Sequence, residues 1–84
     1  MSDSSEYAKK LGARLRAIRT QQGLSLGGVE ELSRGRWKAV VVGSYERGDR
    51  AITVERLALL AEFYGLPTVD LLPPATAAAA EGSR

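Results

Sequence analysis

The sequence predicts an all-α, compact domain of five short helices followed by a polar tail. Apolar residues recur at helical spacing in several segments, glycine or proline ends most of these segments, and the links between them are short. The chain has 84 residues, which is enough for one small domain. We expect that domain at residues 5–73, a flexible start at residues 1–4, and a linker or disordered tail at residues 74–84.

The first two helices are marked by caps and apolar stripes. The first is expected over residues 5–22 and ends at Gly23. Its stripe consists of Tyr7, Leu11, Leu15 and Ile18. The second is expected from the N-cap Ser25 to about Leu32, with Leu26, Val29 and Leu32 facing inward.

The third segment, residues 37–46, is ambiguous by propensity alone. Its run of Ala39 followed by three valines favours a strand. Its place after two helices and a short turn favours a helix, and we adopt that interpretation. A fourth helix is expected from Thr53 to Tyr64, with a stripe of Val54, Leu57, Leu60, Ala61 and Tyr64. A short fifth helix is expected over residues 68–72.

Composition excludes several classes of function. Cysteine and histidine are both absent, so the chain has no disulfides, no thiolate metal site and no Ser-His-Asp triad. We therefore expect no cofactor and no enzymatic activity. The sequence shows neither a membrane-spanning apolar run nor a signal peptide, and we expect a cytoplasmic protein.

Charge is unevenly distributed along a chain whose net charge is only +2. Residues 34–50 carry five cations, Arg34, Arg36, Lys38, Arg47 and Arg50, against two anions. A basic segment is typical of proteins with a polyanionic partner. Charge alone nevertheless favours a solvated surface, so the case for a nucleic-acid partner depends on the motifs.

Two short motifs indicate a particular protein family. The order Arg-x-x-x-Gly-Leu-Ser, starting at Arg19, is followed by Glu-Arg-Gly, starting at Glu46. With the leucines of the later helices, residues 7–72 resemble the Cro/repressor-type (XRE) helix-turn-helix family. The resemblance implies a lambda-repressor-like fold that binds double-stranded DNA sequence-specifically, as a homodimer on an inverted-repeat operator, with the third helix in the major groove.

Residues 6–72, and above all residues 15–26 and 35–50, also closely resemble the DNA-binding domain of a family of developmental regulators from actinomycete bacteria. This closer resemblance implies a repressor of sporulation and secondary-metabolism genes at the bacterial nucleoid. It also implies that cyclic di-GMP acts through a separate C-terminal domain, which we expect to be absent from these 84 residues.

The resemblance assigns roles to individual residues. Base contacts are expected from Lys38, Ala39, Val40 and Ser44. Phosphate contacts are expected from Ser25, Leu26, Arg34, Arg36, Arg47 and Arg50. Arg19 and Glu46 are expected to form a structural ion pair. The segment between Val29 and Glu46 is two residues longer than the common family pattern, and the extra length falls near residues 34–36, so base contacts are transferred from the family only to within about one residue.

Simpler roles remain open for several of these residues. Val40 and Val42 can be core residues, Ser25 can be only a helix cap, and Trp37 can pack under the turn instead of against DNA. A protein-interaction module that uses the same fold is the main alternative function. The basic charge near the third helix argues against it, because a protein-binding face exposes apolar surface. An enzyme is a distant third possibility, since no nucleophile–base pair is evident.

Overall fold

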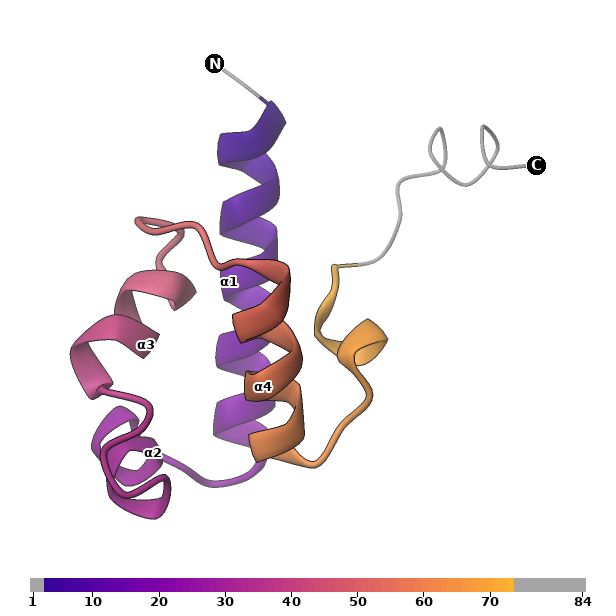
Figure 1. Ribbon diagram of the computed structural model, residues 1–84. Helices are drawn as coiled ribbons and strands as arrows, with labels where there is room; N and C mark the ends of the chain where they lie inside the picture. Colours follow the sequence, from indigo (N-terminus) through magenta and orange to yellow (C-terminus); the bar gives the residue numbers. More distant parts are fainter. Residues whose placement is uncertain (1–2, 74–84) are drawn as a thin grey trace.

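The computed structural model describes residues 3–73, and these residues form four α-helices and one short 3₁₀ helix, with no strand (Figure 1). The elements are α1 (Asp3–Gln21), α2 (Leu26–Leu32), α3 (Ala39–Glu46), α4 (Val54–Tyr64) and the 3₁₀ helix η1 (Thr68–Leu71). The all-α helix-turn-helix fold is confirmed, but the predicted fifth helix is a single 3₁₀ turn. Four residues between Pro67 and Leu72 are too few for a stable α-helix. The predicted tail lies outside the described residues.

Two helix starts differ from their expected positions. The first helix begins at Asp3, two residues before the expected start. The third begins at Ala39, because Lys38 is an N-cap with extended backbone and Trp37 belongs to the preceding turn. The valine run after Ala39 is helical despite its strand propensity, which shows that tertiary packing decides its conformation.

The helices are arranged around α1 (Figure 1). Helix α3 packs against α1, with α2 beneath it, and η1 packs against α1 and α4. The figure shows α2 and α3 on one side of the α1–α4 pair and η1 on the other. Thus α3 lies at the edge of the domain and leaves one of its faces uncovered.

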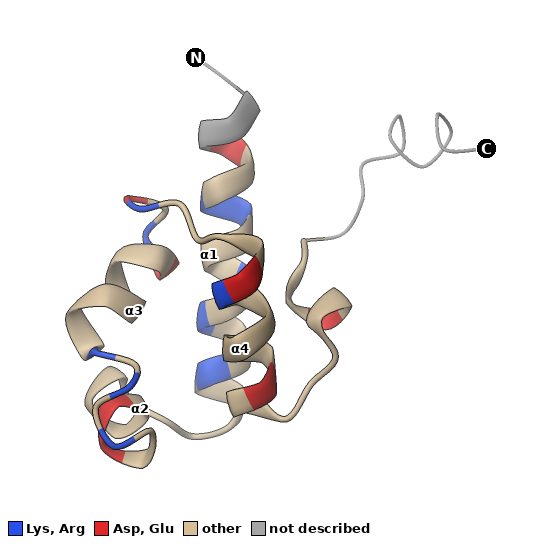
Figure 2. Cartoon of the chain, viewed as in Figure 1, with Lys and Arg blue, Asp and Glu red and all other residues tan. Residues whose placement is uncertain are grey.

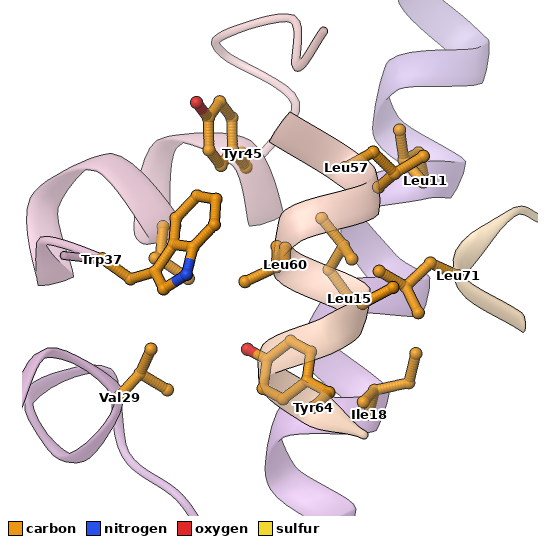
Figure 3. Close-up of a cluster of buried hydrophobic side chains, with 12 residues drawn as sticks. Leu11, Leu15, Ile18, Val29, Trp37, Tyr45, Leu57, Leu60, Tyr64 and Leu71 are labelled. Atoms are coloured by element: carbon orange, nitrogen blue, oxygen red, sulfur yellow. The ribbon is translucent and has the colours of Figure 1, made fainter. Parts of the chain in front are cut away.

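The core consists of twelve buried residues from every element and from the turn before α3 (Figure 3). They are Leu11, Leu15, Ile18, Val29, Trp37, Val42, Tyr45, Leu57, Leu60, Ala61, Tyr64 and Leu71. Trp37 is only 2% exposed, so it packs under the turn as the simpler interpretation expected, and Val42 is fully buried. The core therefore holds both α3 and its preceding turn.

Three residues assigned to apolar stripes are exposed instead. Tyr7 is 48%, Leu32 64% and Val54 81% exposed. Tyr7 and Val54 lie in the first or second turn of their helices, and Leu32 is the last residue of α2. The periodic pattern of apolar residues continues to the ends of these helices. At these ends, however, no neighbouring element covers the apolar side chains.

The described residues contain neither a membrane span nor a metal cluster. No helix in residues 3–73 has the length and apolar character needed to cross a bilayer. The same residues bring together no three side chains able to hold a metal ion.

Candidate nucleic-acid interface

Helix α3 has one buried and one open face. Val42, Gly43 and Tyr45 are buried against the domain. Val40, Ser44 and Arg47 follow at spacings of four and three residues and so lie along the opposite face. Val40 is 81% exposed, which rules out the core role that remained open for it. An exposed valine on a surface helix is available for contact with a partner.

Ser44 uses its hydroxyl hydrogen within the helix. Its Oγ donates to the carbonyl oxygen of Val41 at 2.7 Å. A hydroxyl has one donor hydrogen and two acceptor lone pairs, so in this rotamer Ser44 can still accept a hydrogen bond. Ala39, another predicted base-contacting residue, is half-buried at the first position of the helix.

The N-terminal end of α3 is held by a side chain from α2. Lys38, the N-cap, makes no side-chain capping hydrogen bond. Instead the backbone N–H of Ala39 donates to Oε1 of Glu30 at 2.8 Å. The Glu30 carboxylate also lies 3.9 Å from Nζ of Lys38, whose side chain is 63% exposed. The sequence assigned no role to Glu30, which is nine residues before the group that it caps.

The C-terminal end of α3 is held by a buried ion pair. Arg19 donates from Nε and one terminal nitrogen to the two carboxylate oxygens of Glu46, at 2.7 and 2.8 Å. Its other terminal nitrogen donates to the carbonyl of Leu24 at 2.9 Å. The two side chains are 10% and 5% exposed. The hydrogen bond to Glu46 raises the pKa of Arg19 above its usual value, although burial acts in the opposite direction.

Close packing of α1 against α3 requires a glycine at position 12. A Cβ at Gly12 would lie 2.5 Å from the carbonyl oxygen of Tyr45 and closer still to that of Glu46. Both atoms belong to the backbone, so they cannot move aside as a flexible side chain can. A glycine in the middle of a long helix was the only signal in the sequence for this contact.

Exposed cations flank α3 on both sides in the chain. Arg34 and Arg36 lie between α2 and α3, and Arg47 and Arg50 follow α3; all four are exposed. Figure 2 shows blue, basic segments in the turn before α3 and in the loop after it. Within α3 itself, the only charged residue is the acidic one at its C-terminal end. Nε of Arg47 donates to Asp49 at 2.9 Å, an exposed pair that contributes little stability.

The N-terminus of α2 lies close to the middle of α3. Ser25 caps α2 by accepting a hydrogen bond from the N–H of Gly28 at 2.9 Å. The N–H groups of the residues before Gly28 have no acceptor within the helix. A Cβ at Gly43 would lie 3.3 Å from Leu26, which means that α2 and α3 are tightly packed there.

The turn before α3 has its own internal contacts. Ser33 Oγ accepts from the N–H of Trp37 at 2.9 Å. The guanidinium of Arg56 lies 5.0 Å from the centre of the Trp37 ring, and its Nε donates to the Tyr45 hydroxyl at 3.2 Å. Arg34 adopts a left-handed backbone with φ of 56°, a conformation that favours glycine. These contacts join the turn to Tyr45 of α3 and to Arg56 of α4.

The known proteins that this chain is similar to have the same helix-turn-helix fold. A family model described as a helix-turn-helix domain matches residues 10–74. The crystal structure of the DNA-binding domain of BldD is 79% identical, with a TM-score of 0.81, over 87% of this chain and 100% of that chain. The S. venezulae BldD DNA-binding domain is 81% identical, with a TM-score of 0.80, over 81% and 99%.

A more distant relative is the restriction-modification controller protein C.AhdI from Aeromonas hydrophila. It is 32% identical with a TM-score of 0.69, over 77% of this chain and 96% of that chain. No curated protein matches the sequence. These findings confirm both resemblances seen in the sequence, and BldD is the developmental regulator to which the closer one refers. The chain belongs to the helix-turn-helix domain family.

Proposed function

We propose that this chain is the sequence-specific DNA-binding domain of a transcription regulator, and that α3 enters the major groove. The observation that carries the proposal is the open face of α3, on which Val40 is 81% exposed, with exposed cations before and after the helix. An α-helix fits the major groove, where each base pair has a distinct pattern of donors, acceptors and methyl groups. The BldD and C.AhdI relatives support the same function.

Four residues contact the base edges in this proposal. Val40 and Ala39 offer methyl groups to the C5-methyl of thymine. Ser44 accepts a hydrogen bond, because its own hydrogen is engaged with Val41, and its suitable partners are adenine N6 and cytosine N4. Lys38 reaches guanine or a phosphate from the start of the helix. None of these residues is a bidentate reader such as asparagine, so each domain discriminates modestly between sequences.

Phosphate contacts fix the position of the domain on the duplex. We assign them to the exposed cations on either side of α3, Arg34, Arg36, Arg47 and Arg50, and to Ser25 and Leu26 at the start of α2. Binding then releases counterions, so affinity falls steeply as salt rises. Neutralising one cation by substitution is expected to lower the slope of log K against log salt by about 1.

Two copies are needed for strong specificity. One domain covers a short half-site, and two domains on an inverted repeat, about one helical turn apart, add their contacts. We expect a monomer in solution that dimerises on DNA. A light-scattering mass of twice that of the chain, without DNA, would contradict this expectation.

The regulatory setting follows from the BldD resemblance alone. We propose a bacterial repressor that acts at the nucleoid on developmental and secondary-metabolism genes. Any response to cyclic di-GMP would need a C-terminal domain beyond the part of the chain that the structure describes.

Selection of bound duplexes from a random pool, near physiological salt, tests the proposal. Enrichment of an inverted repeat is expected, and its spacing defines the arrangement of the two domains. Enrichment of a single half-site would mean that each domain reads DNA without pairing. Binding with no enrichment, and loss of binding as salt rises, would leave only phosphate attraction and favour the protein-interaction alternative.

A further inference from the structure

Helix α3 begins under unfavourable conditions. Its first turn is Ala39 followed by three valines, and β-branched residues lose side-chain freedom in a helix. Its N-cap is a lysine, whose side chain has no oxygen to accept the free N–H groups. A lysine also places positive charge at the positive end of the helix dipole. The start of α3 therefore depends on a group from elsewhere in the chain.

Glu30 supplies that group. Its Oε1 accepts from the N–H of Ala39 at 2.8 Å, and its negative charge faces the positive end of the α3 dipole. The carboxylate also lies 3.9 Å from Nζ of Lys38, the neighbouring cation. A single side chain of α2 thus contacts both the first residue of α3 and the cation before it.

The backbone of Glu30 closes the turn that leads to α3. Its carbonyl accepts from the N–H of Gly35 at 2.8 Å and from the hydroxyl of Ser33 at 3.2 Å. The same Ser33 hydroxyl accepts from the N–H of Trp37 at 2.9 Å. Main chain and side chain of one residue therefore bridge α2, the long turn and the start of α3.

We propose that Glu30 is a positioning residue for DNA recognition, acting through its hydrogen bond to the start of α3. This inference rests on the proposed function of α3. The negative charge of Glu30 repels DNA phosphates and so weakens binding. Its benefit to binding must therefore come from positioning the residues that contact the bases. Glu30 sets the direction from which Lys38, Ala39 and Val40 approach the bases, and its removal loosens that end of the helix without removing any base-contacting group.

Two substitutions separate positioning from charge. Glu30→Gln keeps an oxygen that can accept from Ala39 and loses the charge, whereas Glu30→Ala loses both. Glu31→Gln is the matched control, because it removes the same charge one residue away, on an exposed side chain. The readout is the ratio of affinity for the selected duplex to affinity for a scrambled duplex at one salt concentration. Amide hydrogen exchange at Ala39 in the free protein provides a measurement without DNA.

For Glu30→Ala we expect faster exchange at Ala39 and a specificity ratio about fivefold to tenfold lower, the scale set by loss of one helix cap. Glu30→Gln and Glu31→Gln should keep the ratio while binding both duplexes more tightly. Equal tightening by all three variants, with the ratio unchanged, would overturn the inference and leave the proposed function intact. Failure of the unsubstituted chain to prefer the selected duplex would overturn both, whereas unchanged exchange at Ala39 in Glu30→Ala would overturn the inference alone.

Discussion

The two ends of α3 are held in different ways. At its C-terminal end, α3 is joined to α1 by the buried pair of Arg19 and Glu46 and by backbone contact at Gly12. At its N-terminal end, α3 is joined to α2 by Glu30, whose side chain is 40% exposed, and by hydrogen bonds within a turn. The first end is part of the domain core, and the second lies at the surface. Changes at the C-terminal end should therefore lower global stability, and changes at the N-terminal end should mainly alter DNA recognition.

Loss of Glu46 is expected to have the largest effect on stability. Glu46→Leu leaves the Arg19 charge buried without its partner, which costs about 3–5 kcal/mol of unfolding free energy. Urea denaturation measures this cost. The double variant Arg19→Met/Glu46→Leu should recover much of it, because no buried charge remains. A double variant no more stable than the single one would show that the ion pair is not the cause.

Gly12→Ala should be the next most damaging change at this end. The added methyl group meets two backbone carbonyl oxygens, so α1 and α3 must separate, at a cost of about 3 kcal/mol. Gly27→Ala is the matched control, because its Cβ would be 4.0 Å from its nearest neighbour, Ser25 Oγ. That variant should gain about 0.5–1 kcal/mol from helix propensity. If thermal melts show equal effects for both variants, the close contact at Gly12 is not required.

Tyr64, the last residue of α4, makes the stability of the domain sensitive to alkaline pH. Burial, with a smaller contribution from the negative charge of Glu46, raises the pKa of the Tyr64 hydroxyl from 10.0 to about 12. The folded state thus holds the proton more tightly than the unfolded chain. This contribution to stability is complete below pH 10 and is lost as the pH rises toward 12, by about 2 kcal/mol.

Tyr64→Phe tests this sensitivity. The Tyr64 hydroxyl is buried and makes no hydrogen bond within residues 3–73, so its removal should be neutral or slightly stabilising at pH 7. Denaturant melts between pH 9 and 12 should then show less alkaline destabilisation in the variant. Parallel loss of stability in both proteins would assign the effect to other groups.

A smaller loss of stability than that of Glu46→Leu or Gly12→Ala is expected at the N-terminal end. Ser33→Ala removes the acceptor for the N–H of Trp37 in the turn, at a cost of about 1 kcal/mol by urea denaturation. The turn is partly exposed, so water replaces some of this bond. A cost as large as that of Glu46→Leu would remove the contrast between the two ends.

Sequence patterns predicted the features that depend on local chemistry. Ser25 caps α2 as expected, and α4 ends at Tyr64 as expected, followed by Gly65 in a left-handed conformation, because these features need only neighbouring residues. The motif resemblance pointed to Arg19 and Glu46 as partners, although they are 27 residues apart. The patterns failed where a role depends on a distant neighbour, as for Gly12 under α3 and Glu30 at its start. They also assigned Leu32 to the core, because periodicity does not show where packing stops.

The central claim is that the open face of α3 contacts the DNA bases and that the cations around α3 contact the DNA phosphates. Amide chemical shifts, measured during titration with the selected duplex, test this claim. The largest changes are expected from Lys38 to Arg47 and at the start of α2, with little change in η1. Saturation at one duplex per two chains would support pairing on the operator. Changes concentrated around the exposed Val69 and Leu72, with α3 unaffected, would contradict the account.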